Sequence, residues 1–130
     1  MKTAFLTQIM IVGTGGFIGS VLRFVVGTWT QRLAATGDFP YGTLVVNVLG
    51  CLLIGLLGGL AEYRQVLEPG TRLFLLVGIL GGFTTFSTFA YETLSLAQDA
   101  EFARALINIL LQVVLGFGAA LVGLAAARSL

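Results

Sequence analysis

Long apolar runs fill four segments of the chain, and short polar stretches separate them. We expect helices that cross a membrane over approximately residues 5–29, 43–60, 73–97 and 105–127. About 20 apolar residues in a helix are needed to cross a hydrocarbon core roughly 30 Å thick. The pattern therefore predicts an all-α integral membrane protein, with a single domain over residues 1–130 that holds four transmembrane helices.

Composition supports this class and excludes several functions. Hydrophobic residues make up 57% of the 130 residues and charged residues only 10%, whereas a soluble domain carries about 25% charged residues. The net charge of +1 gives no reason to expect a nucleic-acid partner. The apolar composition makes membrane lipid the expected environment. The chain has no histidine, and its single cysteine, Cys51, is interpreted as a small buried residue. No group of residues forms a convincing active site, and we do not expect an enzyme.

The third apolar segment contains a stretch that is unfavourable for a helix. Residues 81–89 read GGFTTFSTF, with two glycines and four hydroxyl residues. Such residues weaken a helix and offer carbonyl and hydroxyl groups to other partners. Irregular backbone at membrane depth is tolerated only where it is buried in protein or lines a cavity. We therefore predict that the third helix is broken near Gly81–Thr88.

The break has two chemical interpretations, and the first is a cation site. Backbone carbonyls freed between Gly81 and Thr84, contributed by two symmetric copies, would suit a dehydrated alkali cation. A plain kink at the glycine pair is the alternative.

The second interpretation is an anion path. Phe86 and Phe89 are three residues apart and so face the same way on the second half of the helix, and the edge of a phenyl ring is electropositive. Asn47 offers amide donors, Ser87 and Thr88 offer hydroxyls, and the start of the half-helix adds a positive dipole end. Such groups favour a small, hard anion. Packing in the core or against lipid is the alternative for the two rings.

Polar residues on two other helices are further candidates for this path. Thr43 lies one turn before Asn47 on the same face of the second span. Asn108 and Gln112 lie four residues apart on the fourth span, so they also share a face. The pair forms either a polar track beside the phenylalanines or hydrogen bonds between helices.

Two charged residues are candidates for a vestibule. Arg23 lies near the end of the first span, where it either sets a positive potential at a pore mouth or extends its charge to the interface. Glu92 lies one turn beyond Phe89 and either lines the vestibule or sits at the membrane surface.

Positive charges are nearly balanced between the two ends of the four-helix unit. Because four spans put both termini on one side, four charges fall on that side and three on the other. The first group is Lys2, Arg64, Arg72 and Arg128, and the second is Arg23, Arg32 and Arg104. A charge bias normally fixes orientation, and here it is almost absent. Four glycine-rich helices also form a thin bundle, so we expect an antiparallel, dual-topology homodimer with the break at its centre.

Three motifs resemble those of the fluoride channel family known as Fluc or CrcB. They are GGFIGSVLRF at residues 15–24, GTLVVNVLG at residues 42–50, and GGFTTFSTF at residues 81–89, closed by Glu92. The resemblance covers essentially the whole chain. It implies a dual-topology homodimer with two pathways, which exports fluoride passively across a bacterial cytoplasmic (inner) membrane and lowers cytoplasmic fluoride.

The resemblance also implies roles for residues of the third motif. A structural sodium ion at the dimer centre would be held by the backbone carbonyls of Gly81 and Thr84. Phe86 and Phe89 would be the rings that contact fluoride, with Asn47 close by.

Other roles implied by the resemblance are pore hydroxyls at Ser87 and Thr88 and a vestibule position for Arg23. One departure concerns the fourth helix, where the family often has hydroxyl side chains beside the rings. Here that face carries Asn108, Gln112 and Gly116. The side-chain amides of Asn108 and Gln112 offer similar hydrogen bonds.

Two other classes of function compete with this interpretation. A small multidrug-type transporter needs a carboxylate deep in a helix, but no acidic residue precedes Asp38 and Glu92 lies toward a helix end. A purely structural membrane subunit would explain the small-residue faces at Gly15–Gly19 and Gly55–Gly59. It would leave Asn47 and the polar stretch after Gly82 unexplained.

Overall fold

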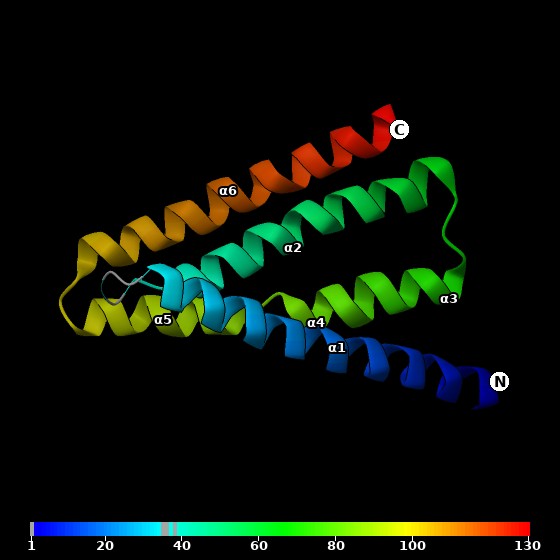
Figure 1. Ribbon diagram of the computed structural model, residues 1–130, viewed down its shortest axis with the longest axis horizontal. Coiled ribbons are helices and arrows are strands. Elements are labelled where there is room, and N and C mark those ends of the chain that lie inside the picture. Colours follow the sequence, from blue (N-terminus) through cyan, green and yellow to red (C-terminus); the bar gives the residue numbers. More distant parts are fainter. Residues whose placement is uncertain (1, 35–36, 38) are drawn as a thin grey trace.

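The computed structural model describes residues 2–34, 37 and 39–130, and helices account for nearly all of them (Figure 1). The first helix, α1, runs over Lys2–Ala34, and the second, α2, over Tyr41–Gly59 with a π-helical extension, η1, over Leu60–Arg64. The third segment comprises α3 (Pro69–Arg72), the π-helical η2 (Leu73–Leu80), α4 (Gly81–Phe83) and α5 (Phe86–Gln98). The last helix, α6, runs over Phe102–Ser129.

Within the described residues, four helical segments are long and apolar enough to cross a membrane. They cover Thr3–Ala34, Tyr41–Arg64, Pro69–Gln98 and Phe102–Ser129. This confirms the prediction of an all-helical protein with four spans, and each predicted range lies inside one of these segments. The helices extend past the predicted ranges because backbone hydrogen bonding continues where the sequence has already become polar.

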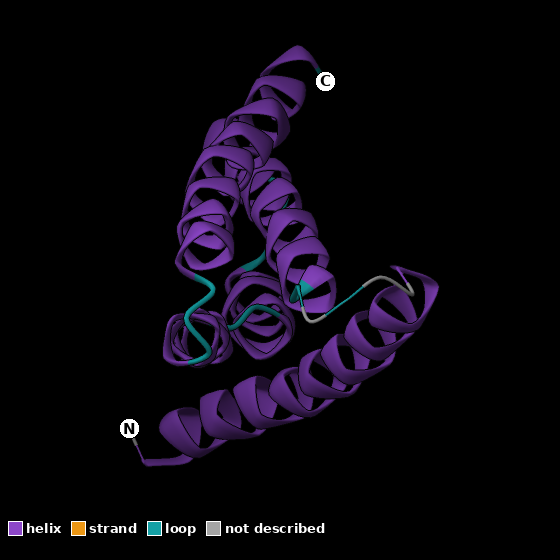
Figure 2. Cartoon of the chain, turned by 90° about the vertical axis from the view of Figure 1, so that its left-hand side faces the viewer, coloured by secondary structure: helices purple, strands orange, loops and turns teal. Residues whose placement is uncertain are grey.

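The helices pack closely in two pairs, α1 with η2 and α2 with α6. Figure 1 shows α2 and α6 side by side and both termini at the same end of the molecule. In Figure 2, seen from one end, α1 lies inclined across the other helices. A Cβ atom added to Gly15 of α1 would lie 2.7 Å from the carbonyl oxygen of Phe74, and one added to Gly123 of α6 would lie 2.7 Å from the Leu56 nitrogen. The backbones therefore touch at these glycines, as the small-residue spacing predicts.

Few large side chains are buried inside the chain. Val46 and Asn108 are the largest fully buried residues among those described, whereas many phenylalanines and leucines are exposed. An exposed apolar surface of this extent is expected of a protein surrounded by lipid or by a second copy.

The break in the third segment is shorter than the predicted range Gly81–Thr88. Only Thr84 (φ −81°, ψ 156°) and Thr85 (φ −151°, ψ 113°) are extended. The glycines stay helical, and the Thr84 N–H donates to the Leu80 carbonyl at 3.0 Å. The following residues are helical as well, because Thr85 caps the start of α5 through its side chain. The prediction of a broken helix is confirmed, and its position is corrected to two residues.

Candidate ion pathway at the helix break

Asn47 on α2 pairs with the extended backbone at Thr85, whose N–H has no acceptor within a helix. The Thr85 N–H donates to Asn47 Oδ1 at 2.8 Å, and Asn47 Nδ2 donates to the Thr85 carbonyl at 3.0 Å. Buried backbone groups without partners are costly, above all at membrane depth. The side-chain amide therefore pairs with the peptide groups of Thr85 much as a neighbouring strand would.

The Asn47 amide also connects the break to α6. Its Nδ2 atom donates a second hydrogen bond to Gln112 Oε1 at 3.1 Å. A carboxamide has two N–H donors, so both donors of Asn47 are engaged by the protein in this structure.

Thr85 is a central residue that the sequence analysis did not single out. It is 7% exposed, and its Oγ1 accepts from the Thr88 N–H at 3.2 Å and donates to Thr88 Oγ1 at 2.9 Å. The Ser87 hydroxyl lies 3.4 Å from the same oxygen. A threonine three residues before the amide that it caps is a common start of a helix, and this spacing was the signal available in the sequence.

A cavity of about 400 Å³ lies beside the break and brings together the predicted rings and amides. Its lining includes Asn47, Gln112, Phe86 and Phe89. The two rings are 5.4 Å apart at their centroids and meet edge to face at 69°. Phe86 is 79% exposed, and Phe89 is partly buried. We refer to this space as the ring cavity.

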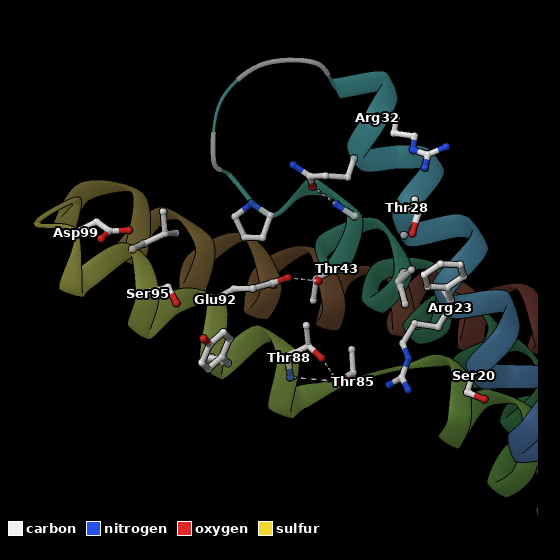
Figure 3. Close-up of a pocket in the computed structure, with 18 residues that line it drawn as sticks. Ser20, Arg23, Thr28, Arg32, Thr43, Thr85, Thr88, Glu92, Ser95 and Asp99 are labelled. Atoms are coloured by element: carbon white, nitrogen blue, oxygen red, sulfur yellow. Dashed lines mark hydrogen bonds between the residues drawn. The ribbon is translucent and has the colours of Figure 1, made fainter.

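A second cavity, of about 750 Å³, contains the charged candidates (Figure 3). Its lining includes Arg23, Thr43, Thr88 and Glu92, and also Arg32 and Asp99. The Thr43 hydroxyl donates to Glu92 Oε1 at 2.6 Å, while Glu92 Oε2 is buried without a hydrogen-bond partner among the described residues. We refer to this space as the vestibule.

The partly buried Arg23 extends from α1 toward the break (Figure 3). Its Nη1 atom lies 3.5 Å from the Thr84 carbonyl oxygen, a long and weak hydrogen bond. Arg23 therefore places a positive charge in the wall of the vestibule, beside the break.

Thr85 lies in the walls of both cavities and is the one described residue that they share. The vestibule contains charges of both signs, whereas the residues that line the ring cavity are all neutral. The two cavities therefore differ in character, one charged and the other lined by amides, hydroxyls and rings.

Asn108 and Ser87 lie outside both cavities. Asn108 is fully buried and donates from Nδ2 to Thr93 Oγ1 at 2.9 Å, so it joins α6 to α5. Ser87 is exposed on α5. Of the pair on the fourth span, Gln112 therefore lies beside the rings, and Asn108 makes a contact between helices.

The carbonyls of Gly81 and Thr84 suit the alkali cation considered for the break. Both residues line the ring cavity. In a continuous helix the Thr85 N–H would bond to the Gly81 carbonyl, but here it donates to Asn47. The Thr84 carbonyl accepts only the long hydrogen bond from Arg23 among the contacts described. Backbone carbonyl oxygens with free lone pairs are the donors that coordinate alkali cations in channel filters.

The fold and this site define a small multi-pass membrane protein with polar and aromatic groups gathered at a broken helix. Residues 10–124 match the sequence profile of the family described as "CrcB-like protein, Camphor Resistance (CrcB)". The chain therefore belongs to the CrcB family, and the resemblance noted in the three motifs is confirmed.

Relatives in three bacteria carry the same name, "Fluoride-specific ion channel FluC". The protein of Agrobacterium fabrum is 46% identical over 123 residues, which are 95% of this chain and 98% of the relative. The protein of Maridesulfovibrio salexigens is 44% identical over 119 residues, covering 92% and 94% of the two chains. The protein of Chlorobium chlorochromatii is 42% identical over 121 residues, covering 93% and 92%.

Proposed function

We propose that this protein is a fluoride-selective ion channel, which lets fluoride leave the cytoplasm down its gradient and so confers fluoride resistance. The observation that carries the proposal is the neutral ring cavity, where amide groups and the two phenylalanine rings are held together beside the break. Thr85 lies in the walls of both this cavity and the vestibule. The names of the relatives support the same ion. A channel needs no bond-making chemistry, in agreement with the expectation that the chain is not an enzyme.

The proposed selectivity follows from the kind of donors available. Fluoride is small and accepts strong hydrogen bonds, so it must exchange tightly held water for good donors at every step. The electropositive edges of Phe86 and Phe89 and the nearby amides contact an anion without the fixed positive charge that would bind it too firmly to leave. Larger anions with weaker hydrogen bonding gain less from the same groups.

We further propose that two copies assemble antiparallel in the bacterial cytoplasmic membrane. The exposed Phe86 ring and the ring cavity lie on the surface of a single chain, where a second copy would complete the wall. The segments that end at Arg64 and Arg72 and the C-terminal end of α6, with Arg128 in its last turn, lie toward the end that holds both termini, whereas the end of α1, with Arg32, and the start of α6 lie toward the other (Figure 1). This nearly even distribution of positive charge between the two ends supports insertion in both orientations.

A structural sodium ion between the two copies is part of the proposal. The carbonyls of Gly81 and Thr84 would hold it, and two copies would contribute four oxygen donors. The bound ion would supply positive charge at the dimer centre. Purification with N-methylglucamine in place of sodium should then lower the thermal stability of the dimer, and an unchanged unfolding temperature would contradict this part.

A multidrug-type transporter and a structural subunit are not favoured. The carboxylate of Glu92 accepts a hydrogen bond from the Thr43 hydroxyl in the vestibule. It does not line the ring cavity. A structural subunit would have no use for two cavities on either side of a helix break that share Thr85 in their walls.

The test of the channel is fluoride efflux from liposomes that contain the purified protein, with a potassium gradient and valinomycin to balance charge. We expect fast fluoride efflux, and no chloride efflux in a parallel experiment. Empty liposomes serve as the control for leakage. Absence of fluoride flux from protein that elutes as a folded dimer would overturn the proposal.

A further inference from the structure

A third cavity, of about 500 Å³, lies where α2 and α6 begin. Figure 1 shows that both helices begin at the same end of the molecule, opposite the two termini. The described lining comes from the connection before α2, the first residue of α2 and the first turns of α6: Gly37, Phe39, Tyr41, Arg104, Ile107 and Leu111. We refer to this space as the α6 groove. It shares no described residue with the ring cavity or the vestibule, so the ion pathway does not account for it.

The wall that α6 contributes changes from charged to apolar along the helix. Arg104, Ile107 and Leu111 are three and four residues apart, so they lie on one face. Because a helix rises about 1.5 Å per residue, Leu111 lies roughly 10 Å from Arg104 along the axis, toward the middle of the span. A phospholipid has its groups in the same order, with a phosphate at the membrane surface and acyl chains beneath it.

The guanidinium of Arg104 has donors left for a ligand. Its Nη1 atom pairs with Glu101 Oε2 at 2.7 Å, and the arginine side chain is 47% exposed. A guanidinium carries five N–H donors, and a Cβ atom added to Gly37 would lie 4.0 Å from Nη2, so this second nitrogen lies beside the wall of the groove. A positive charge in the first turn of a helix also opposes the helix dipole, so the helix itself gains nothing from this arginine.

Phe39 and Tyr41 form the wall of the groove on the side of α2. Their ring centroids are 4.8 Å apart, Phe39 is buried, and Tyr41 is 37% exposed. Tyrosine is common at the level of the lipid headgroups, where its ring contacts acyl chains and its hydroxyl contacts polar groups. The two rings therefore add to the groove the kind of surface that a lipid contacts where its headgroup meets its chains.

A second copy of the chain is not the occupant of this groove. Val113 of α6 lines the ring cavity, whereas Leu111 lines the α6 groove. Successive residues are about 100° apart around a helix, so these two side chains are roughly 200° apart and leave α6 in nearly opposite directions. A copy that covers the ring cavity, as proposed above, leaves the α6 groove facing the membrane.

We propose that the α6 groove binds an anionic phospholipid, with its phosphate on Arg104 and an acyl chain along Ile107 and Leu111. The described lining contains a single charged residue, which is positive and so favours a headgroup with a net negative charge. The bound lipid joins the start of α2 to the start of α6 and stabilises the folded protein by mass action. This site goes beyond the proposed function, because it does not depend on the ion that the protein carries.

The first experiment is native mass spectrometry of the purified protein with equal amounts of phosphatidylglycerol and phosphatidylcholine that have identical chains. We expect the unsubstituted protein to retain phosphatidylglycerol in preference. Arg104→Gln should lower the affinity for this lipid by about tenfold, the usual effect of losing one hydrogen bond to a charged group. Arg72→Gln, at an exposed arginine outside the three cavities, is the matched control and should keep the preference. Equal retention of both lipids by the unsubstituted protein, or the same preference in Arg104→Gln, would overturn the proposal.

Glu101→Gln tests whether the guanidinium of Arg104 holds the phosphate. This change removes the carboxylate that competes for the guanidinium and repels a phosphate. We expect the affinity for phosphatidylglycerol to rise, in the opposite direction to Arg104→Gln. An unchanged or lower affinity would overturn the assignment of the phosphate to Arg104.

The acyl-chain part of the site is tested by filling the groove. Ile107→Trp places an indole in it, and Ile9→Trp on α1 is the matched control, because the two isoleucines are 48% and 49% exposed. We expect added phosphatidylglycerol to raise the unfolding temperature of the unsubstituted protein and of Ile9→Trp, but not that of Ile107→Trp. An equal rise in all three proteins would place the lipid elsewhere and overturn the site. None of these measurements uses fluoride, so failure of this proposal and failure of the proposed function are distinguished.

Discussion

Asn47 and Thr85 are 38 residues apart in the chain and exchange two hydrogen bonds, of 2.8 and 3.0 Å, between one side-chain amide and one residue's backbone. This pairing explains how a membrane helix stays open at two residues. The Thr85 N–H released from the helix is satisfied by a side chain from α2. The same amide then orients Gln112 beside the ring cavity.

Substitution of Asn47 by leucine should destabilise the protein. Leucine has a similar size but leaves the N–H of Thr85 without a partner, at about 1–3 kcal/mol for a buried group. We expect a clear fall in the unfolding temperature in detergent and loss of fluoride efflux. Leu49→Ala, at an exposed position of the same helix, is the control and should have a small effect. Equal stability of Asn47→Leu and the unsubstituted protein would show that the pairing does not support the break.

The hydroxyl of Thr85 should stabilise the start of α5. Thr85→Val keeps the branched shape but removes the oxygen that accepts from the Thr88 N–H, and loss of such a cap costs about 0.5–2 kcal/mol. Thr85→Ser keeps the oxygen and is the matched control. We expect thermal unfolding to rank the unsubstituted protein and Thr85→Ser above Thr85→Val, and the reverse order would contradict the capping role.

Two glycines of α1 should respond to alanine in opposite ways. A Cβ atom at Gly15 would lie 2.7 Å from the Phe74 carbonyl oxygen, whereas one at Gly13 would meet nothing within 4 Å. Gly15→Ala forces α1 away from η2 and should destabilise by about 1–3 kcal/mol. Gly13→Ala should be neutral or raise stability by up to about 1 kcal/mol, because alanine favours a helix over glycine. Thermal unfolding of the two variants, measured side by side, checks the difference in sign.

The ring of Phe86 should be needed for fluoride efflux and dispensable for folding. Phe86→Ile retains an apolar side chain but removes the electropositive ring edge, and the residue is 79% exposed in the single chain. We expect efflux to fall by about tenfold or more, with an unchanged elution volume. Phe5→Ile, at an exposed position of α1 far from the break in sequence, should conduct normally. A similar rate for both variants would exclude a direct role of the ring.

The class of the protein and the presence of a helix break follow from the amino-acid sequence alone. Uninterrupted apolar runs are long enough for a helix to cross a membrane, and that requirement concerns only neighbouring residues. Glycine and hydroxyl residues weaken a helix locally, so residues 81–89 predicted a break without any knowledge of what packs against it. The three motifs then indicated the family.

The exact position of the break and the polar residues near it depend on contacts between distant segments of the chain. Thr84 and Thr85 are extended because Asn47 of another helix bonds to the Thr85 backbone, whereas the glycines that suggested the break remain helical. From the sequence, Asn108 and Gln112 could not be distinguished, because both are amides on the same face of the fourth helix, one turn apart. Contacts with Thr93 and Asn47 separate them, one as a link between helices and the other as part of the ring cavity. These outcomes depend on hydrogen bonds between segments that are distant in the chain, and neither periodicity nor local propensity contains that information.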